Sequence, residues 1–131
     1  MTRQPDDLLL SIDCGTQSVR AILFDLKGNV VAKSQVRFDD YQVPQPGWLE
    51  HDVNGFWQAT AQACQGLWQT HGARKPALRG VSVTTQRGTI MPVDAQGEAL
   101  YPAIIWLDQR NATRLPKISA PWRAAFRAVG A

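Results

Sequence analysis

The residues best suited to chemistry lie close together near the N-terminus. Asp13 directly follows the apolar run Leu8–Ile12. The residues after it carry small, hydroxyl, amide or cationic groups: Gly15, Thr16, Gln17, Ser18 and Arg20. An ionised carboxylate at the end of a buried run needs a strong partner, and a bound Mg²⁺ or its water shell supplies one. Glycine lets backbone N–H groups approach an anion, and the neighbouring side chains add donors. This set suits a metal–polyphosphate ligand.

The sequence leaves a plainer interpretation of the same turn open. Asp13 would then only cap the turn, and Gly15 would supply a positive φ angle. Short motifs of this kind also arise without function, so the residue types alone do not choose between the two interpretations.

The elements around this turn predict a three-stranded antiparallel meander. Leu8–Ile12 and Val19–Asp25 are strand-like runs joined by few residues, which is typical of a tight β-hairpin. A third run, Val30–Phe38, follows a short loop in which Asp25 precedes Gly28. That spacing favours a glycine in the left-handed conformation.

A helix and a crossover strand should follow the meander. Tyr41–Asp52 is rich in proline and glycine and predicts a loop, with Asp52 as the N-cap of a helix. Apolar residues then recur at helical spacing until His71, where Gly72 should end the helix. The β-branched run Leu78–Thr85 predicts a strand, and the order of helix then strand favours pairing parallel to the first strand.

The rest of the chain carries shorter signals. Thr89–Val93 and Ala103–Trp106 are candidate strands, and Asn111–Ile118 and Trp122–Val129 have helical patterns with Pro121 between them.

Composition narrows the class of protein. The chain has 131 residues, of which 44% are hydrophobic and 19% charged, as expected for one globular domain with a core. No apolar run approaches the roughly 20 residues that span a bilayer, and the N-terminus lacks a signal peptide's apolar stretch.

Cysteine content and charge narrow the compartment and the partners. The two cysteines predict reduced thiols and a cytoplasmic protein. The net charge is +3, but the cations are scattered along the chain, so we expect no nucleic-acid or membrane partner.

Four segments resemble known kinases. The pattern D-x-G-T-x-S-x-R, which begins at Asp13, resembles the first phosphate-binding hairpin of the actin/Hsp70/sugar-kinase superfamily. Three later segments are similar, in the same order, to segments of the FGGY carbohydrate kinases: PGWLEHD at 46–52, GVSVTTQRG at 80–88 and AIIWLDQR at 103–110. Four ordered segments are far more specific than the first alone, and they cover most of the chain.

The resemblance implies a fold and an activity. The fold would be α/β, a ribonuclease-H-like (actin-like ATPase) lobe with a mixed sheet, an antiparallel meander and a crossover helix. The activity would be transfer of phosphate from ATP, with Mg²⁺, to a sugar or polyol hydroxyl. Asp13 would help hold the metal. The cofactor's phosphates would face the polar residues of the hairpin: Thr16, Gln17, Ser18 and Arg20. The sugar hydroxyls would contact three residues further along: Gln86, Arg87 and Asp108.

Alternatives remain for several of these roles. Arg87 would pair with a surface carboxylate if it had no ligand, and Asp108 with Arg110 would form a purely structural pair. The whole chain would be a non-catalytic nucleotide- or protein-binding module if the hairpin served binding alone.

The position after the Gln86-Arg87 pair bears on the substrate. In the glycerol-kinase branch a glutamate follows the equivalent of this pair, where this chain has Gly88. Glycerol is therefore expected to be a poor substrate, and a longer sugar or sugar acid a better one.

The resemblance also implies that residues 1–131 are the front part of the kinase N-terminal domain. Family members are several times longer, and their general base and adenosine loops lie downstream of the matched region. We therefore expect the chain alone to be inactive, with the C-terminal part of the same enzyme as its partner. An uncovered apolar surface or open sheet edge should also make it self-associate.

Overall fold

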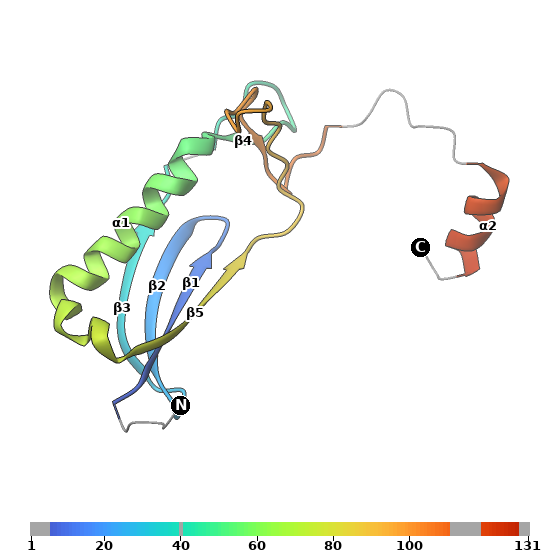
Figure 1. The fold of residues 1–131 in the computed structure, drawn as a ribbon. Coiled ribbons are helices and arrows are strands. Elements are labelled where there is room, and N and C mark those ends of the chain that lie inside the picture. The colour runs from blue at the N-terminus through green and yellow to red at the C-terminus, as the bar shows by residue number, and fades with distance from the viewer. Residues whose placement is uncertain (1–5, 40, 111–118, 129–131) are drawn as a thin grey trace.

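A mixed sheet with one long helix against it forms the main body of the protein (Figure 1). The computed structural model describes residues 6–39, 41–110 and 119–128. Four strands make the sheet, in the spatial order β3-β2-β1-β5: β1 (Leu8–Cys14), β2 (Ser18–Asp25), β3 (Val30–Arg37) and β5 (Leu78–Thr85). The first three are antiparallel, whereas β5 pairs parallel to β1. The predicted meander and parallel crossover strand are confirmed.

Helix α1 (Val53–His71) covers one face of this sheet. It begins as predicted, because the Asp52 carboxylate accepts a hydrogen bond from the backbone N–H of Asn54 at 3.1 Å. Three residues of one helix stripe are buried: Ala59, Ala63 and Leu67. Two of them are alanines, so the helix axis can lie close to the strands.

The two faces of the sheet differ in character. Leu10 of β1 pairs with Leu23 of β2, and both are buried beneath α1. Asp13 pairs with Arg20 in the same two strands. Because side chains alternate between the faces of a strand, Asp13 and Arg20 lie on the face opposite α1. The hydrophobic core and the candidate polar site therefore use opposite sides of one hairpin.

The end of α1 agrees with the prediction, because the α-helix ends at His71 and Gly72 is its C-cap residue. Gly72 has a right-handed φ of −57° and not the left-handed conformation that is common after a helix. The chain continues instead as the 3-10 helix η1 (Gly72–Ala77). Pro76 lies within η1, and its missing N–H prevents the longer α-helical hydrogen-bond pattern from continuing there.

A second, two-stranded sheet lies at the hairpin end of the body. It pairs β4 (Glu50–His51) with β6 (Ala103–Ile104) in antiparallel fashion. The segment predicted as a pure loop thus contains a strand. The candidate strand Ala103–Trp106 is shorter than expected, and the candidate strand Thr89–Val93 forms only isolated bridges, at its second and last residues.

The last described element is helix α2 (Ala120–Ala128). It begins two residues earlier than the predicted helix, and Pro121 lies in its first turn and does not precede it. Proline is tolerated there because the first N–H groups of a helix have no intrahelical partner. The predicted helix Asn111–Ile118 lies outside the described residues. Within the described ranges, no helix is both long and apolar enough to cross a membrane.

Strand β5 is left largely uncovered. Val81 and Val83 pair with residues of β1 whose side chains point toward α1. The helix, however, packs mainly on β2 and β3, so Val81 stays 57% exposed and Val83 60% exposed. The edge of the sheet therefore presents both unpaired backbone groups and apolar side chains.

Candidate functional site

The candidate phosphate site is the turn between β1 and β2. Arg20 Nη1 donates to Asp13 Oδ2 at 2.8 Å, and each side chain is about one-third exposed. The backbone N–H of Gly15 donates to the carbonyl of Ser18 at 3.0 Å, which closes the turn. The φ angle of Gly15 is not positive, so the alternative that it supplies a left-handed conformation is wrong. Its lack of a side chain matters instead, because a Cβ would lie 3.3 Å from the Ser18 carbonyl oxygen.

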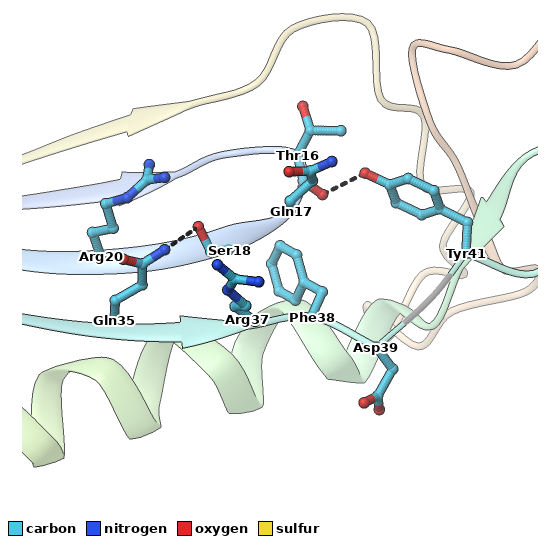
Figure 2. Close-up of a pocket in the computed structure, with 9 residues that line it drawn as sticks. All are labelled: Thr16, Gln17, Ser18, Arg20, Gln35, Arg37, Phe38, Asp39 and Tyr41. Carbon is cyan, nitrogen blue, oxygen red and sulfur yellow. Dashed lines mark hydrogen bonds between the residues drawn. The ribbon is translucent and has the colours of Figure 1, made fainter.

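Thr16, at the tip of this turn, is held from two sides. The hydroxyl of Tyr41 donates to the Thr16 carbonyl at 2.6 Å (Figure 2). The indole Nε1–H of Trp106, 90 residues further along the chain, donates to Thr16 Oγ1 at 3.0 Å. Because Oγ1 is the acceptor in that bond, the Thr16 hydroxyl keeps its own hydrogen for a ligand. The sequence placed Trp106 only at the end of a candidate strand and gave no signal for this contact.

Beside the turn lies a hollow of about 340 Å³ (Figure 2). Its lining combines the four hairpin residues predicted to face phosphate with residues of β3 and the segment after it: Thr16, Gln17, Ser18, Arg20, Gln35, Arg37, Phe38, Asp39 and Tyr41. Gln35 and Arg37 were not predicted. The antiparallel register is the signal that finds them, because it places Gln35 opposite Arg20 and Arg37 opposite Ser18.

The predicted sugar segment meets the hairpin at the end of β1. The backbone N–H of Gln86 donates to the Cys14 carbonyl at 3.0 Å. The side-chain oxygens of Gln86 and Thr89 are buried and have no hydrogen-bond partner among the described residues. Arg87 is exposed, and the described part of the chain offers it no carboxylate within ion-pair distance. The alternative of a surface ion pair for Arg87 therefore finds no support.

Gly88 brings this segment against Trp106. It has a φ of +78°, and a Cβ at this position would lie 3.2 Å from the Cβ of Trp106. Trp106 thus touches the predicted sugar segment on one side and, through Thr16, the phosphate turn on the other. The tryptophan therefore physically joins the two predicted subsites.

Asp108 lies in a network of charged groups. Its carboxylate accepts hydrogen bonds from the backbone N–H of Leu49 at 2.7 Å and from Nε of Arg110 at 2.8 Å. Arg110 also donates to Glu50 at 2.8 Å, and its guanidinium lies 4.0 Å from the ring centroid of Trp48. The structural pair left open by the sequence is therefore present. A contact between Asp108 and a sugar stays a prediction.

This network should make the local structure sensitive to acid. The hydrogen bond from Arg110 lowers the pKa of Asp108 from 3.8 to about 2. A carboxylate whose pKa is lower in the folded state contributes its full stabilisation at any pH above its ordinary pKa. That contribution is lost as the pH falls toward 2. We expect Trp48 fluorescence to report loosening of this region between about pH 4 and pH 2 in the wild type.

Asp108→Asn should abolish that acid step, because asparagine cannot carry the charge that Arg110 binds. Glu98→Gln is the matched control, since Glu98 is an exposed carboxylate whose side chain forms no bond with the described residues. An acid transition in Asp108→Asn that coincides with the wild-type transition would contradict the assignment.

Comparison with known proteins decides the family. Residues 8–127 match the N-terminal domain of the FGGY family of carbohydrate kinases. The chain belongs to this FGGY family. A glycerol kinase from Ligilactobacillus salivarius (strain UCC118) is 38% identical over 114 residues, which are 86% of this chain and 22% of that enzyme. The FGGY chain thus spans about a fifth of the length of the curated relatives it matches.

Solved structures agree with the fold of the FGGY chain. Xylulose kinase from Rhodospirillum rubrum superposes with a TM-score of 0.70 at 27% identity, over 93% of this chain and 23% of the other. Plasmodium falciparum glycerol kinase, determined with ADP, gives a TM-score of 0.65 at 29% identity, over 79% and 21%. These kinases have the actin-like ATPase fold, so the predicted ribonuclease-H-like lobe is confirmed.

The FGGY chain offers a metal ion one carboxylate at the turn. The described residues contain no cluster of three or more histidine, cysteine or acidic side chains. Mg²⁺ does not need such a cluster, because it commonly binds one or two carboxylates, keeps several waters and takes its remaining oxygens from phosphate groups. Asp13, about one-third exposed beside the turn, fits that mode of binding.

Proposed function

We propose that this chain forms the phosphate-binding and part of the sugar-binding surface of an ATP-dependent FGGY carbohydrate kinase. The enzyme would transfer a phosphoryl group from ATP to a hydroxyl of a sugar or polyol. The observation that supports this best is the bridge through Trp106. Its indole contacts Thr16 of the phosphate turn, and its Cβ lies 3.2 Å from the place that a Cβ would take on Gly88, beside the candidate sugar residues. Donor and acceptor would therefore meet in one place.

On the phosphate side, the chain supplies charge and orientation. Asp13 would hold Mg²⁺, which neutralises phosphate charge when it is bound. The hairpin would then orient the phosphate oxygens through hydroxyl, amide and guanidinium donors: Thr16, Gln17, Ser18 and Arg20. Phosphoryl transfer depends mainly on such positioning and charge stabilisation, which this arrangement can provide.

On the sugar side, Gln86 and Arg87 would bind hydroxyl groups, with Asp108 as a third candidate. The buried Gln86 Oε1 has no partner among the described residues, so a sugar hydroxyl would satisfy it. Arg87 is exposed and has no ion-pair partner among the described residues, as a ligand-binding cation should be before its ligand arrives. The general base would come from the C-terminal part of the enzyme, outside residues 1–131.

The preferred substrate is proposed to be longer than glycerol. Gly88 presents only backbone groups toward the candidate sugar site. A site that hydrogen-bonds a hydroxyl discriminates through its polar partners, and a missing partner weakens binding of the small polyol most. The relatives named above include both glycerol and xylulose kinases, so they leave this choice to experiment.

The proposed location is the cytoplasm, where ATP is available. Cys14 and Cys64 are both free thiols in the structure. Free thiols are the usual state of cysteine in reducing compartments.

The test uses two proteins. The purified 131-residue chain, with ATP, Mg²⁺ and a panel of glycerol, pentuloses, hexuloses and aldonates, should form no sugar phosphate, because a positioned base alone contributes about 10²–10⁴-fold. A chimeric kinase, in which this chain replaces the matched segment of the Ligilactobacillus salivarius enzyme, should be active. Its preference for glycerol over the longer substrates should be lower than that of the parent enzyme.

The outcomes separate the competing functions. Turnover by the 131-residue chain itself would show that no other part of the enzyme is needed. A folded chimeric kinase that binds ATP without turnover would favour the non-catalytic module instead. An undiminished preference for glycerol would overturn the substrate proposal alone.

We also propose that the isolated chain self-associates through β5. Val81 and Val83 form an exposed apolar strip along an open strand edge. Sedimentation velocity should show concentration-dependent dimers or larger species, which Val81→Lys should disperse. Val30→Lys is the control, because Val30 is equally exposed but lies at the start of β3. A monomer at every concentration would contradict this proposal.

A further inference from the structure

The hollow beside β3 contains a cation that the proposed phosphate site does not use. Arg37 lines the hollow, is exposed, and forms no hydrogen bond or ion pair with a described residue (Figure 2). Two neighbours that line the hollow have partners: Arg20 binds Asp13, and Gln35 Nε2 donates to Ser18 Oγ at 3.1 Å. Among the described cations that line the hollow, Arg37 is therefore the one without a carboxylate partner.

The strand register places Arg37 next to the phosphate turn. Arg37 is directly opposite Ser18, the first residue of β2, and antiparallel partners point to the same face. Ser18 Oγ accepts its bond from Gln35, so its hydroxyl hydrogen is available to another acceptor. A guanidinium and a free hydroxyl hydrogen thus border one hollow.

The local charge favours an anion. Arg20 is neutralised by Asp13, whereas no carboxylate of the described residues lies within ion-pair distance of Arg37. The one carboxylate among the lining residues, Asp39, points away from the hollow in Figure 2. The volume of about 340 Å³ is far larger than the roughly 30 Å³ that a water molecule occupies in the liquid, so a hydrated phosphate group has room.

We propose that this hollow is an oxyanion subsite in which Arg37 and the Ser18 hydroxyl bind a phosphate group of a polyphosphate chain seated on the turn. This inference rests on the proposed function, and it extends the phosphate site from the hairpin onto β3. Arginine suits the role because its planar guanidinium binds two phosphate oxygens at once.

The test measures anion binding by the 131-residue chain without any turnover. Backbone amide NMR shifts are followed while inorganic triphosphate is added, and inorganic monophosphate is added in a parallel series. We expect shifts at Ser18 and Arg37, with tighter binding of triphosphate. Arg37→Ala should weaken triphosphate binding about fivefold or more, in line with the loss of a charge-assisted hydrogen bond. Arg37→Lys should recover part of the loss.

Lys33→Ala is the matched control. Lys33 lies on the same face of β3, opposite Ile22, and its removal changes the net charge by the same amount. It should alter binding less than about twofold, as expected for a distant exposed charge.

Each of the following results would contradict the proposed oxyanion subsite. Equal weakening by Arg37→Ala and Lys33→Ala would show a general charge effect. If triphosphate shifts Thr16 and Ser18 in Arg37→Ala as it does in the wild type, the hairpin binds phosphate without Arg37. The proposed function would then stand, and the proposed role of Arg37 would be wrong. Equal affinity for monophosphate and triphosphate would exclude a polyphosphate as the ligand, and an absence of shifts would exclude anion binding at the hollow.

Discussion

Asp13→Ala should lower kcat of the chimeric kinase by about 10²–10³-fold, the range seen when one group that stabilises transition-state charge is removed. The carboxylate lies on the proposed metal and phosphate side of the site, beside Arg20 at 2.8 Å. Its loss should therefore act on turnover and on the Mg²⁺ concentration needed for it. The KM for the sugar should change much less, because the residues proposed to bind the sugar lie on other segments.

Steady-state kinetics at several Mg²⁺ concentrations check this expectation. Glu98→Ala is the control, since it removes an exposed carboxylate far along the chain from the turn. If kcat of Asp13→Ala matches that of the control, Asp13 does not act on the metal or the phosphates, and its bond to Arg20 is structural only.

Arg87→Ala should reduce kcat/KM for the preferred sugar by about 10–100-fold, the equivalent of the roughly 1.5–3 kcal/mol that a hydrogen bond to a charged group contributes. Arg87 is exposed and has no ion-pair partner among the described residues, so little folding stability should be lost with it. The KM for ATP should stay close to its original value, because Arg87 belongs to the proposed sugar segment and not to the proposed phosphate turn.

Arg74→Ala provides the comparison, because Arg74 is an exposed cation of η1 whose side chain has no partner among the described residues. Both variants lose one positive charge, so a general charge effect would appear in both. Should Arg87→Ala leave kcat/KM for the preferred sugar unchanged, the assignment of the sugar site to the segment around Gln86 is wrong.

The bridge through Trp106 bears on how the two subsites work together. Its indole donates a hydrogen bond to the Thr16 hydroxyl oxygen, and its Cβ lies against Gly88. A sugar that moved this segment would therefore also move the hairpin that we propose to bind phosphate. Such a connection suits a reaction in which the two substrates must be aligned to within a fraction of an ångström.

Local patterns in the sequence were sufficient for the meander, α1 and β5. Alternating apolar residues identify a strand, a helical period identifies a helix, and Asp52 marks where the helix starts. The predictions failed where the local signal was weak. The predicted loop Tyr41–Asp52 contains β4, which at two residues is too short to show any alternation. The candidate strand Thr89–Val93 forms only isolated bridges.

By itself, the sequence determined the hairpin that carries Asp13 and Arg20, because strand alternation and a short turn bring these two residues face to face. Only the tertiary structure decided the long-range contacts: Trp106 with Thr16, Arg110 with Glu50, and the uncovered valines of β5. The physical reason is that a local pattern specifies the conformation of a few successive residues. Contacts between residues that are distant in sequence depend on how whole elements pack, and no short stretch of residues encodes that packing.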